Sequence, residues 1–235
     1  WVTQRQGDHI VGIDTGSLAV HDHYIESTMS DGCVDTYGIG LDYRNRVWVN
    51  GRSCEGAFRY DPAADSWMTV SLPGHGWGRG ISGDAQGRVW MGHSHNKDKS
   101  VTWGHISSFN ADDGSDPVLY DVPDATGTVG VGADFFGNIW GVNRSSNNAS
   151  RVNPETGEMA VFPVGSGPYT YSDFTGFMLR TFTAPQGTYT LVVPGCEEGP
   201  TEWRHIEWDA EEYPETSVAV RYRAADQIAG LSAVS

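Results

Sequence analysis

The chain has 235 residues and a formal net charge of −15, from 30 acidic residues against 15 lysine and arginine residues. This charge repels polyanions, and the basic residues are scattered along the sequence, so we expect no nucleic acid partner. No apolar stretch approaches the roughly 20 residues of a membrane-spanning helix, so we expect no membrane span in this segment.

The first 24 residues hold a tryptophan followed by valine and then the stretch HIVGIDTGSLAVHD. This stretch predicts two antiparallel strands on either side of a glycine-containing turn. The same succession of a Trp and a hairpin returns three times later in the chain. We therefore expect Trp1 to lie in the middle of a four-stranded unit whose first strand is missing here.

A repeated motif dominates the next part of the chain, in YGIGLDYRNRVWV, RGISGDAQGRVWM and VGVGADFFGNIWG. Each copy reads Gly, a β-branched residue, a small residue, any residue and Asp, then a turn with Gly or Asn, then Val or Ile and Trp. Gly and Asn tolerate the positive φ of tight turns, and an Asp side chain bonds turn amides. Each motif predicts two strands joined by a tight turn, with the Trp packed between units. The repeated positions are Asp42, Trp48, Asp84, Trp90, Asp134 and Trp140.

A second hairpin follows each motif, in AFRYDPAADSW, ISSFNADDGSD and ASRVNPETGEM, which makes four strands per unit. The Trp residues of the motif recur at spacings of 42 and 50 residues. Units of this kind predict the blades of a β-propeller. Residues 1–176 would supply half a blade, three full blades and, from YTYSDFTGF, the start of another. Because a ring closes with about four to eight blades, we expect a piece of a longer polypeptide or a ring that another chain completes.

Residues 177–235 do not follow the blade pattern. Three alternating stretches, GTYTLVVPGC, EWRHIEWDAE and TSVAVRYRAAD, are separated by turns rich in Gly, Pro and Glu. They predict the start of a β-sandwich or jelly-roll module, truncated at the last residue. The expected architecture is therefore all-β, with an incomplete propeller over residues 1–176 and a sandwich-like module over residues 177–235.

Three cysteines bear on the compartment. Cys33 and Cys54 are 21 positions apart and flank one pair of strands, as either a disulfide or two buried thiols. We favour the disulfide and a secreted or cell-surface protein, because disulfides persist in oxidising compartments. Cys196 has no evident mate in the chain.

The pattern D-x-x-G-x-[IV]-W followed by R-[IVY]-[ND]-P-x-[ST]-G, as in GVGADFFGNIW and ASRVNPETGEM, resembles the streptogramin lyase-like propellers, the family of virginiamycin B lyase, and the wider NHL-type propellers. The resemblance covers residues 1–176 and implies a six- or seven-bladed ring. More loosely, the C-terminal segment resembles large secreted or surface proteins of bacteria such as myxobacteria. Lyases of this family use a His general base, acidic residues and magnesium, but their WFTE context is absent here, so no catalytic residue is carried over.

His93 and His95 form a His-x-His pair in GHSHNKDK. On a strand both rings would point to one face, and two imidazoles on one face can hold zinc or copper. The pair is therefore a candidate metal site, with Asp98, His75 or His105 as a further ligand. The alternative is a polar loop between blade strands.

Two loops suggest further sites. NADDGSD, residues 110–116, fits either a calcium loop or an acidic hairpin tip, and we favour the hairpin tip. Trp77 and Trp103 fall outside the repeated position, in the Gly-rich stretches GHGWGRG and VTWGH. They are candidates for an aromatic surface that binds a ligand or partner. The only cofactor that these sites suggest is a divalent metal such as calcium, magnesium or zinc.

The sequence contains no nucleophile elbow, phosphate loop or dinucleotide fingerprint. The leading hypothesis is a non-catalytic, secreted or surface-exposed propeller segment, an interaction or structural module in a larger assembly. Its partners would be other segments of the same polypeptide or another chain that completes the ring. One alternative is a lyase-like enzyme that eliminates across a C–O bond with a metal and whose site lies partly outside this chain. Another is carbohydrate binding through Trp203 and Trp208.

Overall fold

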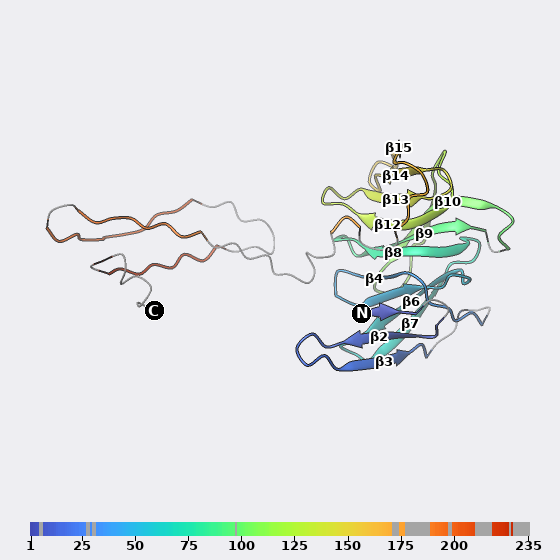
Figure 1. Cartoon of the computed structure of the whole chain (residues 1–235), viewed down its shortest axis with the longest axis horizontal. Helices are drawn as coiled ribbons and strands as arrows, with labels where there is room; N and C mark the ends of the chain where they lie inside the picture. The colour runs from blue at the N-terminus through green and yellow to red at the C-terminus, as the bar shows by residue number, and fades with distance from the viewer. Residues whose placement is uncertain are drawn as a thin grey trace. The chain divides into compact units, whose positions relative to one another are not determined.

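The computed structural model describes residues 1–4, 7–26, 29, 32–96, 98–170, 174–176, 189–196, 199–209, 218–225 and 227. The chain divides into two compact units, Trp1–Pro185 and Gln186–Ser235. Among the described residues, the strands lie in the first unit (Figure 1) and are β1 (Val2–Thr3), β2 (His9–Ile13), β3 (Val20–Tyr24), β4 (Ile39–Leu41), β5 (Val47–Asn50), β6 (Gly56–Asp61), β7 (Ser66–Ser71), β8 (Trp77–Gly83), β9 (Arg88–His95), β10 (Thr102–Asn110), β11 (Val118–Asp121), β12 (Thr128–Ala133), β13 (Ile139–Asn143), β14 (Asn148–Val152) and β15 (Met159–Pro163).

The strands form four separate sheets, in each of which antiparallel neighbours follow one another along the chain. The first sheet, β1-β2-β3, has three strands, and the sheets β4 to β7, β8 to β11 and β12 to β15 have four each. In Figure 1 the sheets succeed one another from the blue strands β2 and β3 to the yellow strand β15. The predicted all-β propeller segment with an incomplete ring is thus confirmed.

An aspartate clamps the turn between the first two strands of the second blade. Asp42 Oδ1 accepts hydrogen bonds from the backbone N–H groups of Arg44 and Arg46, at 2.9 and 3.1 Å. Its Oδ2 accepts from the indole Nε1 of Trp48 at 2.9 Å and from Nε of Arg46 at 2.7 Å. The carboxylate is fully buried, so these donors replace the water that it loses.

The same clamp recurs in the next two blades. Trp90 Nε1 donates to Asp84 Oδ2 at 2.7 Å, and Trp140 Nε1 donates to Asp134 Oδ2 at 2.8 Å. In each blade the other carboxylate oxygen accepts from two turn amides, at 2.8 to 2.9 Å. The spacing of six residues between Asp and Trp in the motif therefore reflects a direct hydrogen bond between the two side chains.

Two Trp side chains, Trp48 and Trp1, pack against the next blade. Trp48 is fully buried and contacts Phe109 of the next blade, with ring centroids 5.3 Å apart. Trp1 contacts Tyr60 in the same manner, at 5.7 Å. Phe109 and Tyr60 lie in β10 and β6, the third strands of their blades. Trp1 therefore occupies the mid-blade Trp position of the three-stranded sheet.

The first strands of neighbouring blades approach so closely that only glycine fits at the contact. A Cβ atom on Gly38 would lie 2.0 Å from the carbonyl oxygen of Arg79, and a Cβ on Gly130 would lie 2.7 Å from that of Thr170. Hence the glycine that opens the motif serves the contact between blades. Thr170 lies in the stretch predicted to start a further blade, whose turn residue Asp173 is outside the described residues.

The second unit contains no hydrogen-bonded strand within 189–196, 199–209 and 218–225, so the predicted β-sandwich or jelly-roll module stays a prediction. In this unit Cys196 is exposed and free, and the side chains of Trp203 and Trp208 are 58% and 59% exposed. The division after Pro185 falls nine residues beyond the predicted domain boundary at residue 176. Among the described residues, no helix has the length and hydropathy needed to cross a bilayer.

Candidate functional site

His93, one half of the predicted His-x-His pair, is sealed inside the third blade. Its ring is fully buried, and Nδ1 lies 3.2 Å from the carbonyl oxygen of Gly76, which can only accept. Nδ1 therefore carries the proton, and Nε2 accepts from the hydroxyl of Ser107 at 2.6 Å. Burial, together with the nearby His75, lowers the pKa of His93 to about 3. The ring is a neutral imidazole with both nitrogens in use.

Of the candidate metal ligands, His75 lies beside His93, with ring centroids 6.1 Å apart, whereas Asp98 and His105 have partners of their own. Asp98 accepts from the backbone N–H of Ser100 at 2.9 Å within its own loop, and His105 Nε2 lies 3.2 Å from Asp121. The described part of the chain holds no group of three or more His, Cys, Asp or Glu side chains that could bind a metal. Both nitrogens of His93 contact protein atoms, and a metal site at this pair stays a prediction.

The acidic loop between β10 and β11 is a hairpin tip that reaches the neighbouring blade. Asp113 accepts from the backbone N–H of Ser115 at 2.9 Å. Asp112 accepts from the hydroxyl of Tyr43 at 2.9 Å and lies 2.8 Å from the guanidinium of Arg46. Because the Asp112 carboxylate links two blades, its charge is already balanced, and the loop does not present a calcium cage.

Trp77 and Trp103, the two predicted surface aromatics, lie near His95 at one end of the third blade. Trp103 stacks on His105, with centroids 4.4 Å apart and planes 24° from parallel. It also fills the space beside Gly76, where a Cβ would lie 2.8 Å from the indole. The Trp77 ring lies 6.4 Å from that of His95. Both Trp side chains are partly buried.

Three cations surround Trp77, and none of them is among the predicted site residues. Lys99 Nζ lies 4.2 Å from the ring centroid, and the guanidinium carbons of Arg79 and Arg52 lie at 5.6 and 5.8 Å. These are cation–π distances. Arg79 also lies 5.2 Å from the ring of Tyr37. No carboxylate of the described residues pairs with any of the three cations.

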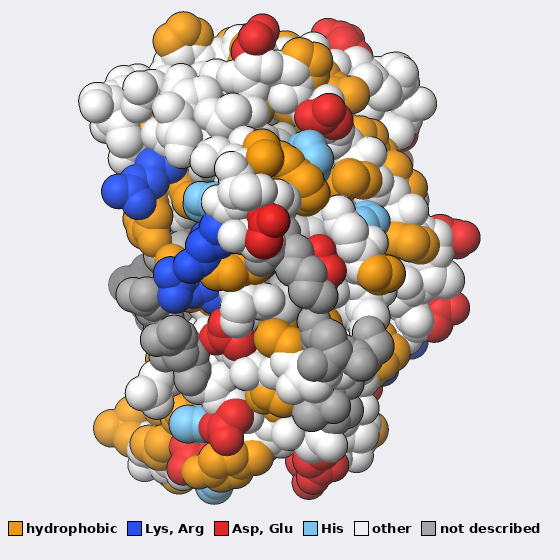
Figure 2. All heavy atoms as spheres, turned by 90° about the vertical axis from the view of Figure 1, so that its right-hand side faces the viewer, with side chains coloured by type: hydrophobic (Ala, Val, Ile, Leu, Met, Phe, Trp, Pro, Cys, Tyr) orange, Lys and Arg blue, Asp and Glu red, His pale blue; other side chains and the backbone are white. Residues whose placement is uncertain are grey.

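A positional signal for these cations is present in the sequence. The loop after the second strand of each full blade carries a basic residue, with Arg52 after β5, Lys99 after β9 and Arg144 after β13. Antiparallel pairing puts the end of that strand beside the start of the first strand, as Trp77 pairs with His95. Basic residues that are scattered along the sequence thus gather in space, and Figure 2 shows most of the visible Lys and Arg side chains along the left of the view.

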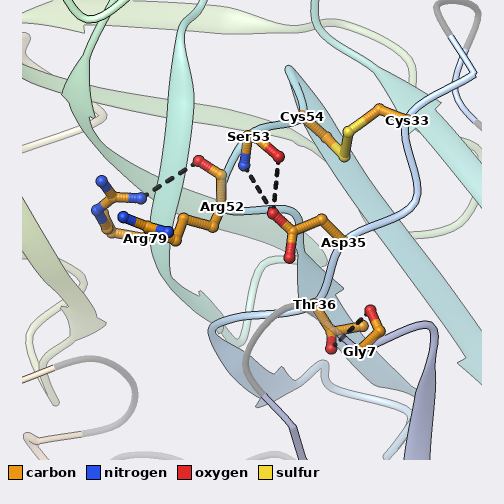
Figure 3. Close-up of a disulfide and its surroundings, with 8 residues drawn as sticks. All are labelled: Gly7, Cys33, Asp35, Thr36, Arg52, Ser53, Cys54 and Arg79. Carbon is orange, nitrogen blue, oxygen red and sulfur yellow. Dashed lines mark hydrogen bonds between the residues drawn. A yellow bond between two sulfur atoms is a disulfide. The ribbon is translucent and has the colours of Figure 1, made fainter.

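A disulfide holds the loop that carries Arg52 (Figure 3). Cys33 and Cys54 are bonded, with Cα atoms 5.6 Å apart, which confirms the predicted pairing. On the same loop, the backbone N–H and hydroxyl of Ser53 donate to Asp35 Oδ2 at 3.0 and 2.8 Å. The loop is therefore attached to the segment before β4 by one covalent bond and two hydrogen bonds.

We expect the double substitution Cys33→Ser and Cys54→Ser to lower the free energy of unfolding by about 3 kcal/mol, because closing a loop of this length restricts the unfolded chain. Urea denaturation under non-reducing conditions measures the change. Cys196→Ser is the matched control, since that thiol is free and exposed. Equal midpoints for the double variant and the control would contradict the prediction.

The cations also act on His95. Burial, followed by the positive charges of Arg79, Lys99 and Arg52, lowers the pKa of His95. These charges disfavour the protonated ring, so Lys99→Ala is expected to raise the His95 pKa toward its ordinary value. Following the ring proton shifts against pH by NMR tests this. Arg44→Ala, at the opposite end of a blade, should leave the titration unchanged, and an unchanged titration for Lys99→Ala would refute the electrostatic account.

Comparison with known proteins gives structural matches alone, since no protein-family profile and no curated protein matches the sequence. Virginiamycin B lyase from Staphylococcus aureus matches with a TM-score of 0.57 and 16% identity, over 70% of this chain and 52% of the lyase. The fold is that of the virginiamycin B lyase propeller. At this identity the match shows the fold and nothing further.

Two other solved structures agree. A catalytically inactive virginiamycin B lyase from Staphylococcus aureus with quinupristin matches with a TM-score of 0.56 and 13% identity, over 69% of this chain and 50% of that one. Hydrazine synthase of Kuenenia stuttgartiensis matches with a TM-score of 0.53 and 12% identity, over 69% and 45%. The chain thus spans about half the length of the lyases that it matches.

Proposed function

We propose that the propeller segment is a non-catalytic interaction module of an extracellular protein, and that further blades of the same polypeptide or of another chain complete its ring. The proposal of a non-catalytic role is supported by His93, which is fully buried and hydrogen-bonded through both nitrogens. A general base must reach the proton that it removes. His93 reaches only protein atoms.

The observation that carries the proposal of ring completion is a difference in burial between equivalent tryptophans. Trp48 and Trp90 are 0% exposed, whereas Trp140 is only partly buried. Trp140 contacts Phe162 of its own blade, and Phe162 is itself 39% exposed. The blade after Trp48 supplies Phe109 as a cover, and a further blade would cover Trp140 in the same way.

The first sheet is open as well. Val2, Ile13 and Val20 of β1, β2 and β3 are 50%, 45% and 62% exposed, and this sheet has three strands where the others have four. The first sheet and the last sheet thus both expose apolar side chains, and such surfaces favour packing against further blades. An extracellular location is supported by the Cys33–Cys54 disulfide, because such bonds persist in oxidising compartments.

Light scattering and amide hydrogen exchange on this chain test the ring proposal. We expect the chain alone to associate beyond its monomer mass of 25.6 kDa, or to exchange β1 to β3 and β13 to β15 much faster than β8 to β10. Trp140→Ser with Phe162→Ser should reduce any association. A stable monomer whose end blades are as protected as the middle blade would overturn the proposal of ring completion.

Incubation with quinupristin tests the non-catalytic role separately. Quinupristin is the compound found with one of the structurally similar lyases. We expect no change in its mass by chromatography and mass spectrometry. Its conversion by the chain, abolished by His93→Gln, would overturn the non-catalytic proposal.

A further inference from the structure

One end of the blades concentrates positive charge in a protein whose net charge is −15. The cations come from the loops after the second strands of three successive blades and from the start of β8. We call this surface the basic end, and its cations are Arg52, Arg79, Lys99 and Arg144. No carboxylate of the described residues pairs with any of them. Elsewhere on the propeller, Arg44, Arg46 and Arg151 have carboxylate partners, whereas Arg59 and Arg88 donate to backbone carbonyls and a serine hydroxyl.

Arg79 is the most informative of these cations because it is only 7% exposed. Its Nη1 donates to the carbonyl oxygen of Arg52 at 3.3 Å (Figure 3) and to that of Gly78 at 3.2 Å. Its other two nitrogens have no hydrogen-bond partner among the described residues. Asp35 acts on Arg79 electrostatically but forms no ion pair with it, and a buried guanidinium without an ion pair is costly, so an anion bound here would reduce that cost. Burial is the largest cause of the lowered pKa of Arg79, and Arg52 lowers it further, whereas Tyr37 and Asp35 act in the opposite direction.

Aromatic rings alternate with the cations at the basic end. Arg79 lies 5.2 Å from the ring of Tyr37, and Arg144 lies 5.4 Å from the ring of Tyr169. The hydroxyls of Tyr37 and Tyr169 are 2.9 Å apart, which brings blades distant in sequence together. With Lys99 at 4.2 Å from Trp77, each cation has a ring beside it.

The ligand that matches this surface carries carboxylates separated by rings. Guanidinium groups bind carboxylates through paired hydrogen bonds, and the C–H faces of sugar rings pack on Trp and Tyr, whose polar atoms meet sugar hydroxyls. A long polyanion such as nucleic acid would meet the negative charge of the rest of the protein, whereas a short ligand within about 8–10 Å of the cations would not.

We propose that the basic end binds a short acidic oligosaccharide, with its carboxylates on the cations and its sugar rings against the aromatic side chains. This inference rests on the proposed binding role and names its ligand class. It differs from carbohydrate binding by Trp203 and Trp208, which belong to the second unit.

Titration calorimetry with a galacturonic acid trisaccharide tests the proposal, and its methyl ester is the matched neutral ligand. We expect the ester to bind at least tenfold more weakly, because it retains the rings and loses the charges. Raising the salt from about 50 to about 300 mM should weaken binding of the acid. Equal affinity for acid and ester, no binding of the acid, or binding of an acidic peptide in place of the saccharide would overturn the inference.

Substitutions locate the site. Lys99→Ala and Arg144→Gln are both at exposed positions and should each weaken binding about three- to tenfold without loss of folding. Arg44→Gln removes an exposed arginine from the opposite end and should change nothing. Equal weakening by Arg44→Gln would mean that net charge alone attracts the ligand and would overturn the assigned site. Cleavage of the bound trisaccharide would overturn the non-catalytic role and leave the ligand class intact.

Discussion

Replacing Asp42 with alanine is expected to lower the free energy of unfolding by about 3–5 kcal/mol, because the buried Arg46 loses its closer carboxylate and keeps only the half-exposed Asp112. Asp42 is 0% exposed and accepts from two turn amides, from Arg46 and from the Trp48 indole. The Arg46 side chain is only 7% exposed, so water cannot replace the lost carboxylate. Urea denaturation followed by Trp fluorescence measures the effect.

Asp134→Ala is the matched control. Asp134 makes the same contacts to its turn and to Trp140. In this blade, however, the position equivalent to Arg46 is occupied by the uncharged Asn138. We expect a smaller cost of about 1–2 kcal/mol, since no buried charge loses its partner. A cost for Asp42→Ala no larger than that for Asp134→Ala would contradict the role assigned to Arg46.

Trp48→Ala is expected to cost about 3–5 kcal/mol, the usual cost of removing a fully buried aromatic side chain. Trp140→Ala in the same chain should cost about half as much, because that indole is only partly buried and packs on one blade alone. Urea denaturation of the two variants and the parent protein gives both values. Equal costs would mean that Trp140 is already covered, which would also count against ring completion.

The fold could be predicted because its repeat is carried by contacts close in sequence. The Asp-to-Trp hydrogen bond spans six residues, and the turn between them requires Asn45, Gly87 or Gly137, all of which have positive φ. These contacts require an Asp, a Gly or Asn, and a Trp at fixed spacings, and this repeated pattern is visible in the sequence. The motif also contains the glycine at position 38. The reason for this glycine, its close approach to Arg79 of the next blade, is visible only in the structure.

The candidate site could be predicted only in part, because exposure and neighbours depend on register. The spacing of His93 and His95 left a strand and a polar loop both open, and it could not indicate that β9 is an interior strand on which His93 meets Gly76 and Ser107. The pairing of β8 with β9 also contains register shifts, so the spacing of two residues along the sequence does not determine which face of the sheet their side chains point to. The cations of the basic end lie on different loops, so their gathering follows from the repetition of blades rather than from any local run of charge.

The Asp-centred turns have a consequence for how the molecule is made. The aspartate of each turn finds all its hydrogen-bond partners within six residues, and each sheet pairs only strands adjacent in the chain. Pairings this close in sequence form without the closure of long loops. A nascent chain can therefore pair the strands of one sheet before the next is synthesised, whereas the contact of Trp48 with Phe109 forms only when the following sheet is present.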